Sequence, residues 1–258
     1  MYKYRPGFFD YINSGSLESA GALIPILCEH LEIESVLDLG CGQGAWLKVW
    51  DENGVPDITG IDGPYVDQET LLIEQTHFQA GDLTRPIRLG RKFDLVQCLE
   101  VAEHIPPEAS ATLVENLTSH GSVLLFSAAT PGQGGEHHIN EQTPEFWRNL
   151  FAAHEYVLLD FLRPRLTGRS EVESWYRYNT FLFVARDHLP ALPDRVRASA
   201  LADHAKIPRN EPLLYRIRCE LLRLFPQRTV DAVARLKHFA VARTRGHAGR
   251  RARGEAHE

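Results

Sequence analysis

Short apolar runs bounded by turn residues alternate with segments of helical periodicity over the first 188 of the 258 residues. Strand-length apolar runs separated by amphipathic helices are typical of βα units, whose strands lie parallel in one sheet. The pattern predicts an α/β fold, a mostly parallel seven-stranded sheet with helices on both faces. The predicted strands are 35–39, 58–62, 77–80, 93–99, 122–127, 156–161 and 180–185.

Helical patterns fill the gaps between these strands. We expect helices over 11–31, 44–53 and 107–117, and a further helix that starts at Thr143 with Pro144 in its first turn. After residue 188 a Pro-, Ala- and Arg-rich link leads to two basic amphipathic stretches, 213–225 and 230–241. The chain is thus predicted to consist of a main domain (1–188), a basic helical C-terminal extension (189–242) and a disordered tail (243–258).

The charge is distributed unevenly between these parts. Residues 189–258 carry 15 Lys and Arg against 7 Asp and Glu, whereas residues 1–188 carry 13 against 27. An acidic main domain disfavours a broad nucleic-acid surface, so we expect no DNA partner and no RNA partner for it. The basic extension has three open interpretations: helices packed on the domain, a contact between two copies, or attachment to an anionic membrane surface.

The chain shows no targeting or membrane-spanning signal. Residues 1–10 lack a basic region followed by an apolar one, and the longest apolar runs are only as long as strands. The four cysteines show no CxxC spacing, which favours free thiols. We therefore expect a cytoplasmic protein.

The segment from Val36 to Trp46 predicts a buried strand, a glycine turn and the start of a helix. Gly40, Gly42 and Gly44 allow positive φ and a close approach of a ligand to the main chain, at a helix N-terminus. The run Gly40-x-Gly42-x-x-Ala45 also fits the dinucleotide fingerprint. However, Asp38 would repel a pyrophosphate, whereas it suits a ligand that carries an ammonium and a sulfonium group. We infer that the cofactor is S-adenosylmethionine.

Two further acids follow the next predicted strands. Asp62 lies 24 residues beyond Asp38, near the distance at which such folds place an acid that binds ribose hydroxyls. Asp82 offers a carboxylate to an adenine amino group, and Leu83 offers an apolar neighbour to its ring. Because parallel strands end at one edge of the sheet, the three acids are expected to share a ligand site.

A second group of polar residues follows the fourth predicted strand. Glu100, Glu103 and His104 have the spacing i, i+3, i+4, which places them on one face of a helical turn. Two carboxylates this close repel each other unless a cation or a proton lies between them. Carboxylates plus an imidazole suit Mg²⁺ or Mn²⁺. Such a metal would lower the pKa of a substrate hydroxyl, and the segment 132–142 could bring a later histidine.

Taken together, these motifs resemble those of the class I S-adenosylmethionine-dependent methyltransferases. The resemblance covers residues 15–186 and rests on Val36-Leu-Asp-Leu-Gly-Cys-Gly-Gln-Gly44, Gly60-Ile-Asp62, Gly81-Asp82-Leu83 and Phe93-Asp-Leu-Val96. It implies a Rossmann-like sheet that binds S-adenosylmethionine. By this resemblance the three glycines contact the methionine part, Asp62 the ribose and Asp82 the adenine.

The second group resembles the ExxEH metal site of small-RNA 3′-terminal ribose methyltransferases and of ubiquinone-pathway O-methyltransferases. By position Glu100, Glu103 and His104 match ExxEH, and His138 matches the later ligand, although the choice between His137 and His138 stays open. The runs Phe126-Ser-Ala-Ala-Thr-Pro-Gly-Gln-Gly-Gly135 and His138-Ile-Asn-Glu-Gln142 are similar to bacterial methyltransferases of glycan and natural-product assembly. The chain departs from the small-RNA enzymes in lacking their RNA-binding additions.

The resulting hypothesis is an O-methyltransferase, assisted by Mg²⁺ or Mn²⁺, that acts on a hydroxyl of a sugar, a glycan or a related small molecule. Glu100, Glu103 and His104 are the candidate catalytic residues. Alternatively, His104 acts as a metal-free general base, or the two glutamates only stabilise the N-terminus of the following helix. The alternative functions are an RNA-end ribose methyltransferase and a non-catalytic regulator that binds the cofactor.

Overall fold

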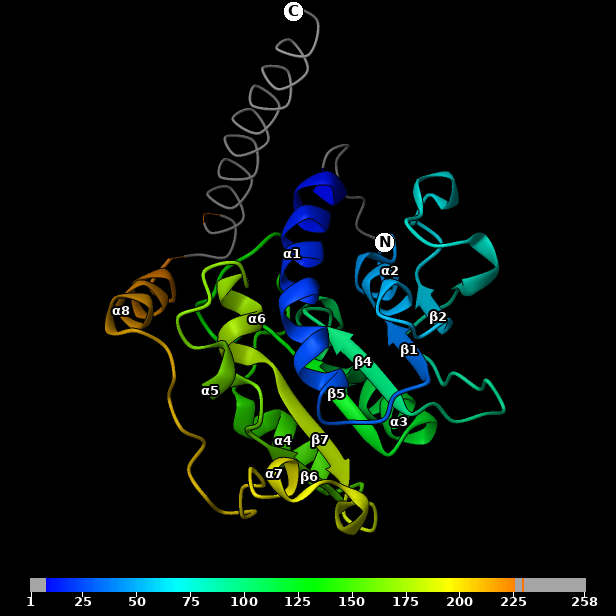
Figure 1. The fold of residues 1–258 in the computed structure, drawn as a ribbon. Coiled ribbons are helices and arrows are strands. Elements are labelled where there is room, and N and C mark those ends of the chain that lie inside the picture. Colours follow the sequence, from blue (N-terminus) through cyan, green and yellow to red (C-terminus); the bar gives the residue numbers. More distant parts are fainter. Residues whose placement is uncertain (1–7, 226–228, 230–258) are drawn as a thin grey trace, which may run out of the picture.

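The computed structural model describes residues 8–225 and 229, and its core is one seven-stranded sheet (Figure 1). The strand order is β3-β2-β1-β4-β5-β7-β6; the first five strands in this order pair parallel, and β7 runs antiparallel to β5 and β6. This confirms the predicted Rossmann-like α/β fold. The strands are β1 (Ser35–Leu39), β2 (Asp57–Asp62), β3 (Phe78–Ala80), β4 (Leu95–Leu99), β5 (Val123–Ser127), β6 (Tyr156–Leu159) and β7 (Phe181–Ala185).

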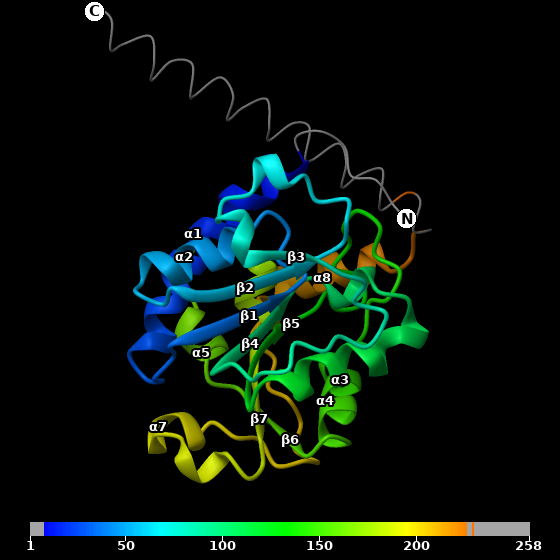
Figure 2. The same ribbon diagram turned by 90° about the vertical axis from the view of Figure 1, so that its right-hand side faces the viewer.

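Helices cover both faces of the sheet (Figure 2). The α-helices are α1 (Phe8–Cys28), α2 (Ala45–Glu52), α3 (Ser110–His120), α4 (Pro144–Ala152), α5 (Arg163–Leu166), α6 (Ser174–Asn179), α7 (Asp194–Arg197) and α8 (Leu213–Leu222). Short 3-10 turns are η1 (Gln68–Thr70), η2 (Gln75–His77), η3 (Ala102–His104), η4 (Pro107–Ala109) and η5 (Leu189–Ala191). Helices α1 and α2 lie on one face, and α3 and α4 lie on the other.

Alternation of side chains along the central strands builds a separate core on each face. Val36 and Leu95 point to the core that contains α1 and α2, whereas their neighbours Leu37 and Val96 point to the core that contains α3 and α4. All residues of β1, β4 and β5 are buried, as expected for parallel strands covered on both sides. Near-continuous apolar runs were therefore a reliable strand signal in this chain.

The predicted boundaries differ from the structure mainly where a strand or helix meets a turn. Strand β1 has the predicted limits, but β4 begins at Leu95, because Phe93 forms only an isolated bridge to Gly121. The predicted helix over 107–117 is the turn η4 followed by α3, which continues to His120. Helices α5 and α6 occupy the connection from β6 to β7, for which no clear helix was predicted.

After β7 the described part of the chain first packs on the domain and then forms a basic helix. Leu192, Val196 and Ile207 are buried, and Ala200 bridges to Leu159 of β6. Helix α8 falls within the predicted stretch 213–225, whereas the predicted helix 230–241 and the tail 243–258 lie outside the described residues. No helix among the described residues is long and apolar enough to cross a membrane.

A buried ion pair ties the end of β6 to the later segments. Arg163 is 2% exposed and donates from Nε and Nη2 to the two carboxylate oxygens of Asp160, at 2.8 and 2.7 Å. Its guanidinium also donates to the carbonyl oxygens of Tyr178 and Pro208 and lies over the ring of Phe181, 4.1 Å from the centroid. One side chain therefore connects α5, α6, β7 and the link to α8.

Replacing Arg163 with Met should lower the free energy of unfolding by about 3–5 kcal/mol, because Asp160 would stay buried without its charged partner. Urea unfolding followed by circular dichroism measures this change. Arg197→Met is the matched control, since Arg197 pairs with Asp194 in solvent and such pairs contribute about 0–1 kcal/mol. Equal losses in the two variants would contradict the structural role given to Arg163.

Candidate active site

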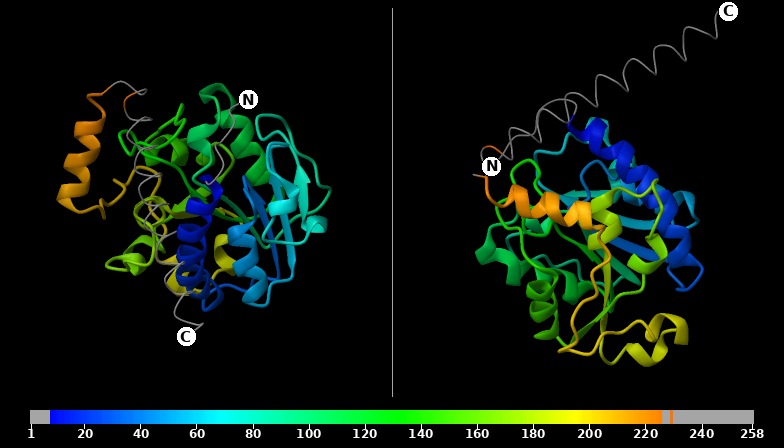
Figure 3. Two further views of the ribbon diagram at one scale, coloured as in Figure 1. Left: turned by 90° about the horizontal axis from the view of Figure 1, so that it is seen from above. Right: turned by 90° about the vertical axis from the view of Figure 1, so that its left-hand side faces the viewer.

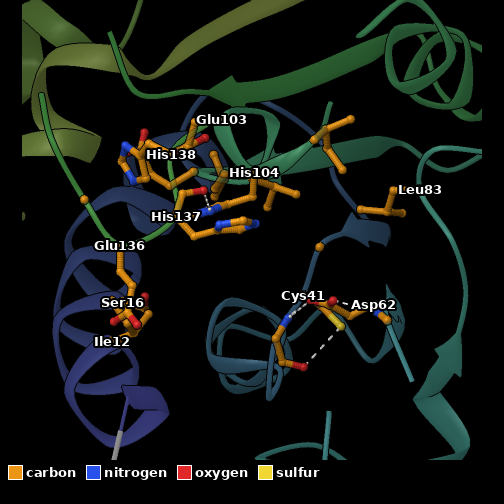
Figure 4. Close-up of a pocket in the computed structure, with 18 of the residues that line it drawn as sticks. Ile12, Ser16, Cys41, Asp62, Leu83, Glu103, His104, Glu136, His137 and His138 are labelled. Carbon is orange, nitrogen blue, oxygen red and sulfur yellow. Dashed lines mark hydrogen bonds between the residues drawn. The ribbon is translucent and has the colours of Figure 1, made fainter. Parts of the chain in front are cut away.

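A cavity of about 580 Å³ lies where β1, β2, β4 and β5 end, and it collects most of the predicted site residues. Figure 4 shows Glu103, His104 and His138 grouped at one end, with Asp62 and Leu83 across from them. Residues of α1 and α6 close the remaining sides, among them Ser16 and Tyr176, whose hydroxyls lie 3.0 Å apart. The cofactor-type and ExxEH-type groups thus share one cavity.

The glycine turn after β1 has the left-handed backbone that its sequence predicts. Gly40, Gly42 and Gly44 have φ values of 93°, 53° and 86°. A Cβ on Gly40 would lie 2.4 Å from a methyl of Val101, and one on Gly44 would lie 2.8 Å from Ile73. Gly40 and Gly42 line the cavity, whereas Gly44 is the N-cap of α2 and lies outside the lining.

Asp38 is held by a chain of buried hydrogen bonds that crosses the sheet. Trp50 of α2 donates from Nε1 to Gln97 Oε1 at 2.9 Å, and Gln97 Nε2 donates to Asp38 Oδ2 at 2.8 Å. The pKa of Asp38 is raised to about 7, mainly by burial; the bond from Gln97 acts against this rise, and the nearby charge of Asp62 contributes to it. A positively charged ligand would relieve this cost, because it favours the ionised carboxylate.

Asp62 lies at the end of β2 and receives three donors. The amides of Gly42 and Gly63 donate to it at 2.7 and 2.6 Å, and the hydroxyl of Tyr65 donates at 2.5 Å. Burial nevertheless raises the pKa of this carboxyl above its usual range. The predicted ribose ligand therefore lines the cavity together with a tyrosine that sequence reasoning missed.

Asp82 and Leu83 form the rim of the cavity on the side of β3. Leu83 is buried and Asp82 is exposed, and both line the cavity. Hydrogen bonds from the Thr84 hydroxyl and amide lower the pKa of Asp82, which keeps it ionised. Both side chains thus lie at the cavity, and their contacts with an adenine ring stay a prediction.

The predicted helical face of Glu100, Glu103 and His104 is wrong in its geometry. Only Ala102–His104 form a turn, η3, and Glu100 precedes it with a φ of 56°, which is uncommon for a residue with a side chain. The amide of Glu100 donates to the carbonyl and hydroxyl oxygens of Ser127, at 3.0 and 3.2 Å. This left-handed residue, rather than a helix, turns the two glutamates toward each other.

The loop between β5 and α4 brings the later histidine to this turn. The carbonyl of Glu103 accepts from the amides of Ile139 and Asn140, at 2.9 and 3.0 Å. Ligand atoms of Glu103, His104 and His138 consequently lie within 4.8 Å of one another. The structure groups His138, not His137, with ExxEH, while Glu100 lies beside the group and outside it.

Neighbouring oxygens orient both imidazoles. His104 Nδ1 lies 3.1 Å from the carbonyl oxygen of His137, and His138 Nδ1 lies 2.9 Å from Glu141 Oε1. Both oxygens are hydrogen-bond acceptors, so Nδ1 carries the donated hydrogen in each pair, and in the neutral form of this tautomer Nε2 is left with the lone pair. Oxygen partners of this kind fix metal-binding histidines in the correct tautomer.

Glu141 also holds the shape of the loop that carries His138. Its two carboxylate oxygens accept from the amides of Gly132 and Gly134, at 2.7 and 2.9 Å. Burial acts to raise the pKa of Glu141, but the bonds from His138 and the two amides lower it overall. An ionised Glu141 therefore connects the loop backbone to the imidazole, a role that no sequence motif revealed.

The buried carboxylates fit a divalent cation. Both oxygens of Glu103 and Oε1 of Glu100 are buried without a hydrogen-bond partner of normal geometry among the described residues. Burial raises the pKa of Glu103 well above its usual range, and the charge of Glu100 adds to this, against the amides of Glu103 and Ala129. Carboxylate oxygens and imidazole nitrogens together suit Mg²⁺ or Mn²⁺.

The two alternatives for this group fit the geometry less well. Burial and the proximity of His138 lower the pKa of His104 to about 3, which makes it a weak base without a metal. A helix-stabilising role is also disfavoured, because α3 begins only at Ser110, beyond the separate turn η4.

The aromatic side chains of α4 and α6 differ in whether they line the cavity. Trp175 and Tyr176 line the cavity. Tyr178 instead packs its ring against Tyr215 of α8, 5.0 Å between centroids. Trp147 and Phe151, on α4, are buried in the core.

A family model for methyltransferase domains matches residues 14–195. The chain belongs to this family. The match and the seven-stranded sheet together identify a class I S-adenosylmethionine-dependent methyltransferase domain.

Curated relatives of this methyltransferase domain are similar over part of their length. The ubiquinone biosynthesis O-methyltransferase of Neisseria meningitidis serogroup C is 29% identical over 160 residues, 56% of this chain and 63% of that protein. The corresponding protein of Stutzerimonas stutzeri is 27% identical over 172 residues, 58% of this chain and 66% of that protein. The chain therefore spans less than two thirds of these relatives.

Solved structures show the same fold. DesVI of Streptomyces venezuelae has a TM-score of 0.53 and 16% identity, over 69% of this chain and 95% of that chain. The sugar N-methyltransferase KedS8 of a Streptoalloteichus species has a TM-score of 0.53 and 19% identity, over 72% of this chain and 96% of that chain.

The affinity of the methyltransferase for S-adenosylmethionine should fall as the pH drops below about 7. The cationic ligand favours ionised Asp38. The affinity is therefore highest above the pKa that Asp38 has in the free protein, and it falls by up to about tenfold per pH unit below that pKa. Calorimetric titrations between about pH 5.5 and 8.5, a range that brackets this pKa, measure how the affinity changes with pH. Asp38→Asn should flatten the profile, whereas Asp82→Asn should keep it; a wild-type affinity independent of pH would refute the assignment.

Proposed function

We propose that this methyltransferase transfers the methyl group of S-adenosylmethionine to a hydroxyl group, with the help of a divalent metal held by Glu103, His104 and His138. The observation that carries the proposal is a pair of buried carboxylates with unpartnered oxygens, facing two imidazoles whose Nδ1 atoms are already engaged. A neutral alcohol is a poor nucleophile and needs activation. Transfer to a hydroxyl would therefore explain why a cluster of carboxylates and imidazoles lies next to the proposed cofactor site.

One end of the cavity would bind the methyl donor, and the other end would bind the metal. At one end Asp38 and Asp62 present negative charge, and Gly40 and Gly42 present open backbone, for the amino acid and ribose parts of the donor. At the other end Glu103, His104 and His138 would hold the metal, and Glu100 lies close enough to act on Glu103. Bound there, Mg²⁺ or Mn²⁺ would lower the pKa of an acceptor hydroxyl.

Positioning supplies the remainder of the proposed catalysis. The shared cavity would hold donor and acceptor side by side, and such ordering can contribute up to about 7–11 kcal/mol to lowering a barrier. Burial of the carboxylates excludes water from the reacting groups and strengthens their interaction with any cation. Tyr176 and Trp175 would close the side of the cavity next to α6.

The acceptor class we favour is a sugar or glycan hydroxyl, or a related small molecule. Trp175, which is partly buried at the cavity wall, offers a flat ring on which the apolar face of a sugar or an aromatic ring can stack. The matched relatives include O-methyltransferases of ubiquinone biosynthesis, which supports transfer to oxygen. The chain covers only part of those proteins, so the acceptor rests on the cavity rather than on their substrates.

Mass spectrometry of reactions with donor and a panel of acceptors tests the proposal. The panel contains sugar hydroxyls, catechol-type hydroxyls, amino sugars and a short RNA with a free 3′-terminal ribose. We expect methylation of a sugar or phenolic hydroxyl that stops with a chelator and returns with Mg²⁺ or Mn²⁺. Full turnover in the presence of the chelator would refute metal assistance. N-methylation of amino sugars, or methylation of the RNA, would refute the acceptor class. Donor binding without transfer to any acceptor would favour a regulator.

Glu141→Gln should weaken Mn²⁺ binding by about 10–100-fold, because the carboxylate that orients His138 loses its charge. Electron paramagnetic resonance of free Mn²⁺ measures the affinity without any turnover. Glu103→Gln should abolish binding at the same site. Glu115→Gln is the matched control, since Glu115 is half exposed on α3 and pairs only loosely with Arg88, at 3.6 Å. Wild-type affinity in Glu141→Gln would contradict its role.

A further inference from the structure

Exposed apolar side chains gather on one helix of the described structure. Among all described residues, eight large apolar side chains are exposed, and two of them, Tyr65 and Ile139, line the cavity. The other six lie on α8 or directly after it, and Leu214 is 80% exposed. They are Leu213, Leu214, Ile217, Leu221, Leu224 and Phe225, hereafter the α8 stripe. A concentration of this kind marks an interaction surface rather than scattered surface residues.

The helical spacing places the stripe on one side of α8. Because each residue turns a helix by about 100°, Leu213, Leu214, Ile217 and Leu221 fall within an arc of about 100°. The opposite side holds the helix on the domain. Cys219 is buried there, and its carbonyl oxygen would lie 2.2 Å from a Cβ on Gly132. The stripe consequently faces away from the domain, and Figure 3 shows α8 at the periphery of the molecule.

Positive charge accompanies the stripe. Arg216, Arg218 and Arg223 are exposed on or next to α8, and Glu220 is the one acid between Leu213 and Phe225. Arg218 borders one side of the stripe, and Arg216 and Arg223 lie toward the other. Residues 226–258 add eight Lys and Arg against three Asp and Glu.

This positive charge distinguishes between the possible binding partners of the α8 stripe. The positive residues 226–258 and the positive α8 of a second copy would both repel the arginines beside the stripe. A surface that is apolar inside and negatively charged at its boundary complements both features at once. Bilayers with anionic headgroups have this structure, and amphipathic helices with basic flanks bind them in the interfacial plane.

We propose that α8 is an interfacial helix that docks this methyltransferase on an anionic lipid surface. The α8 stripe inserts at the boundary between headgroups and acyl chains, and Arg216, Arg218 and Arg223 contact the headgroup phosphates. The protein then binds the surface reversibly, without a spanning segment. This proposal is independent of the metal and of the acceptor.

Co-sedimentation of the full-length protein with vesicles tests this docking. We expect binding to vesicles of phosphatidylcholine with phosphatidylglycerol, and weak binding to phosphatidylcholine alone. The variant Leu214→Glu/Ile217→Glu should lose binding by at least about tenfold, because it places charge in the inserted face. Arg216→Gln/Arg223→Gln should lose roughly fivefold for each arginine. All four side chains are exposed, so the variants should keep the wild-type melting temperature.

The matched control is Gln68→Glu/Gln75→Glu, which adds the same two negative charges at exposed positions away from α8. It should bind vesicles as the wild type does. The proposal is overturned if the wild type ignores anionic vesicles or if the α8 stripe variant binds them normally. It is also overturned if that variant abolishes self-association in sedimentation velocity without affecting vesicle binding, or if the wild type binds RNA but not lipid.

Discussion

Four carboxylates are buried around one cavity, and the cost of keeping their charges away from water governs the site. Asp38 lies in β1 and Asp62 in β2, and Glu100 and Glu103 lie just after β4. Burial raises the pKa of each of them. Such a cluster is favourable only when protons or cations compensate it. The free protein is therefore arranged to gain stability from positively charged ligands.

The parallel sheet explains how these charges come together. The carboxyl ends of parallel strands meet at one edge, so acids far apart in sequence become neighbours without any long loop. The two ends of the cavity nevertheless differ in their donors. Amides and a hydroxyl surround Asp62, which suits an organic ligand that shares hydrogen bonds. The oxygens of Glu103 have no hydrogen bond of normal geometry among the described residues, and two imidazoles lie beside them, which suits a cation that accepts lone pairs.

The sequence predicted elements better than contacts across the sheet. Strand β1 and the glycine turn were predictable because a mainly apolar run of strand length and three glycines each have one good local explanation. Gln97 orients Asp38 from the neighbouring strand, and this pairing depends on register between segments 59 residues apart. The choice of His138 over His137 likewise depends on hydrogen bonds from the loop to Glu103, which no local pattern encodes. The motif located the acids, but folding decides which of them face one another.

Hydrogen bonds connect helix α8 to the loop that lines the candidate active site. Arg218 of α8 donates to the carbonyl oxygen of Gln133 at 3.1 Å, and Gln133 Nε2 donates to Glu100 Oε2 at 2.8 Å. The Asn179 side chain donates to Gln133 Oε1 at 2.6 Å, so this glutamine is held from three sides. A contact that restrains α8 is therefore connected to the Glu100 carboxylate through one intervening residue, Gln133. A surface-bound α8 would restrict the loop that carries His138, and so would favour the arrangement of the proposed cation site.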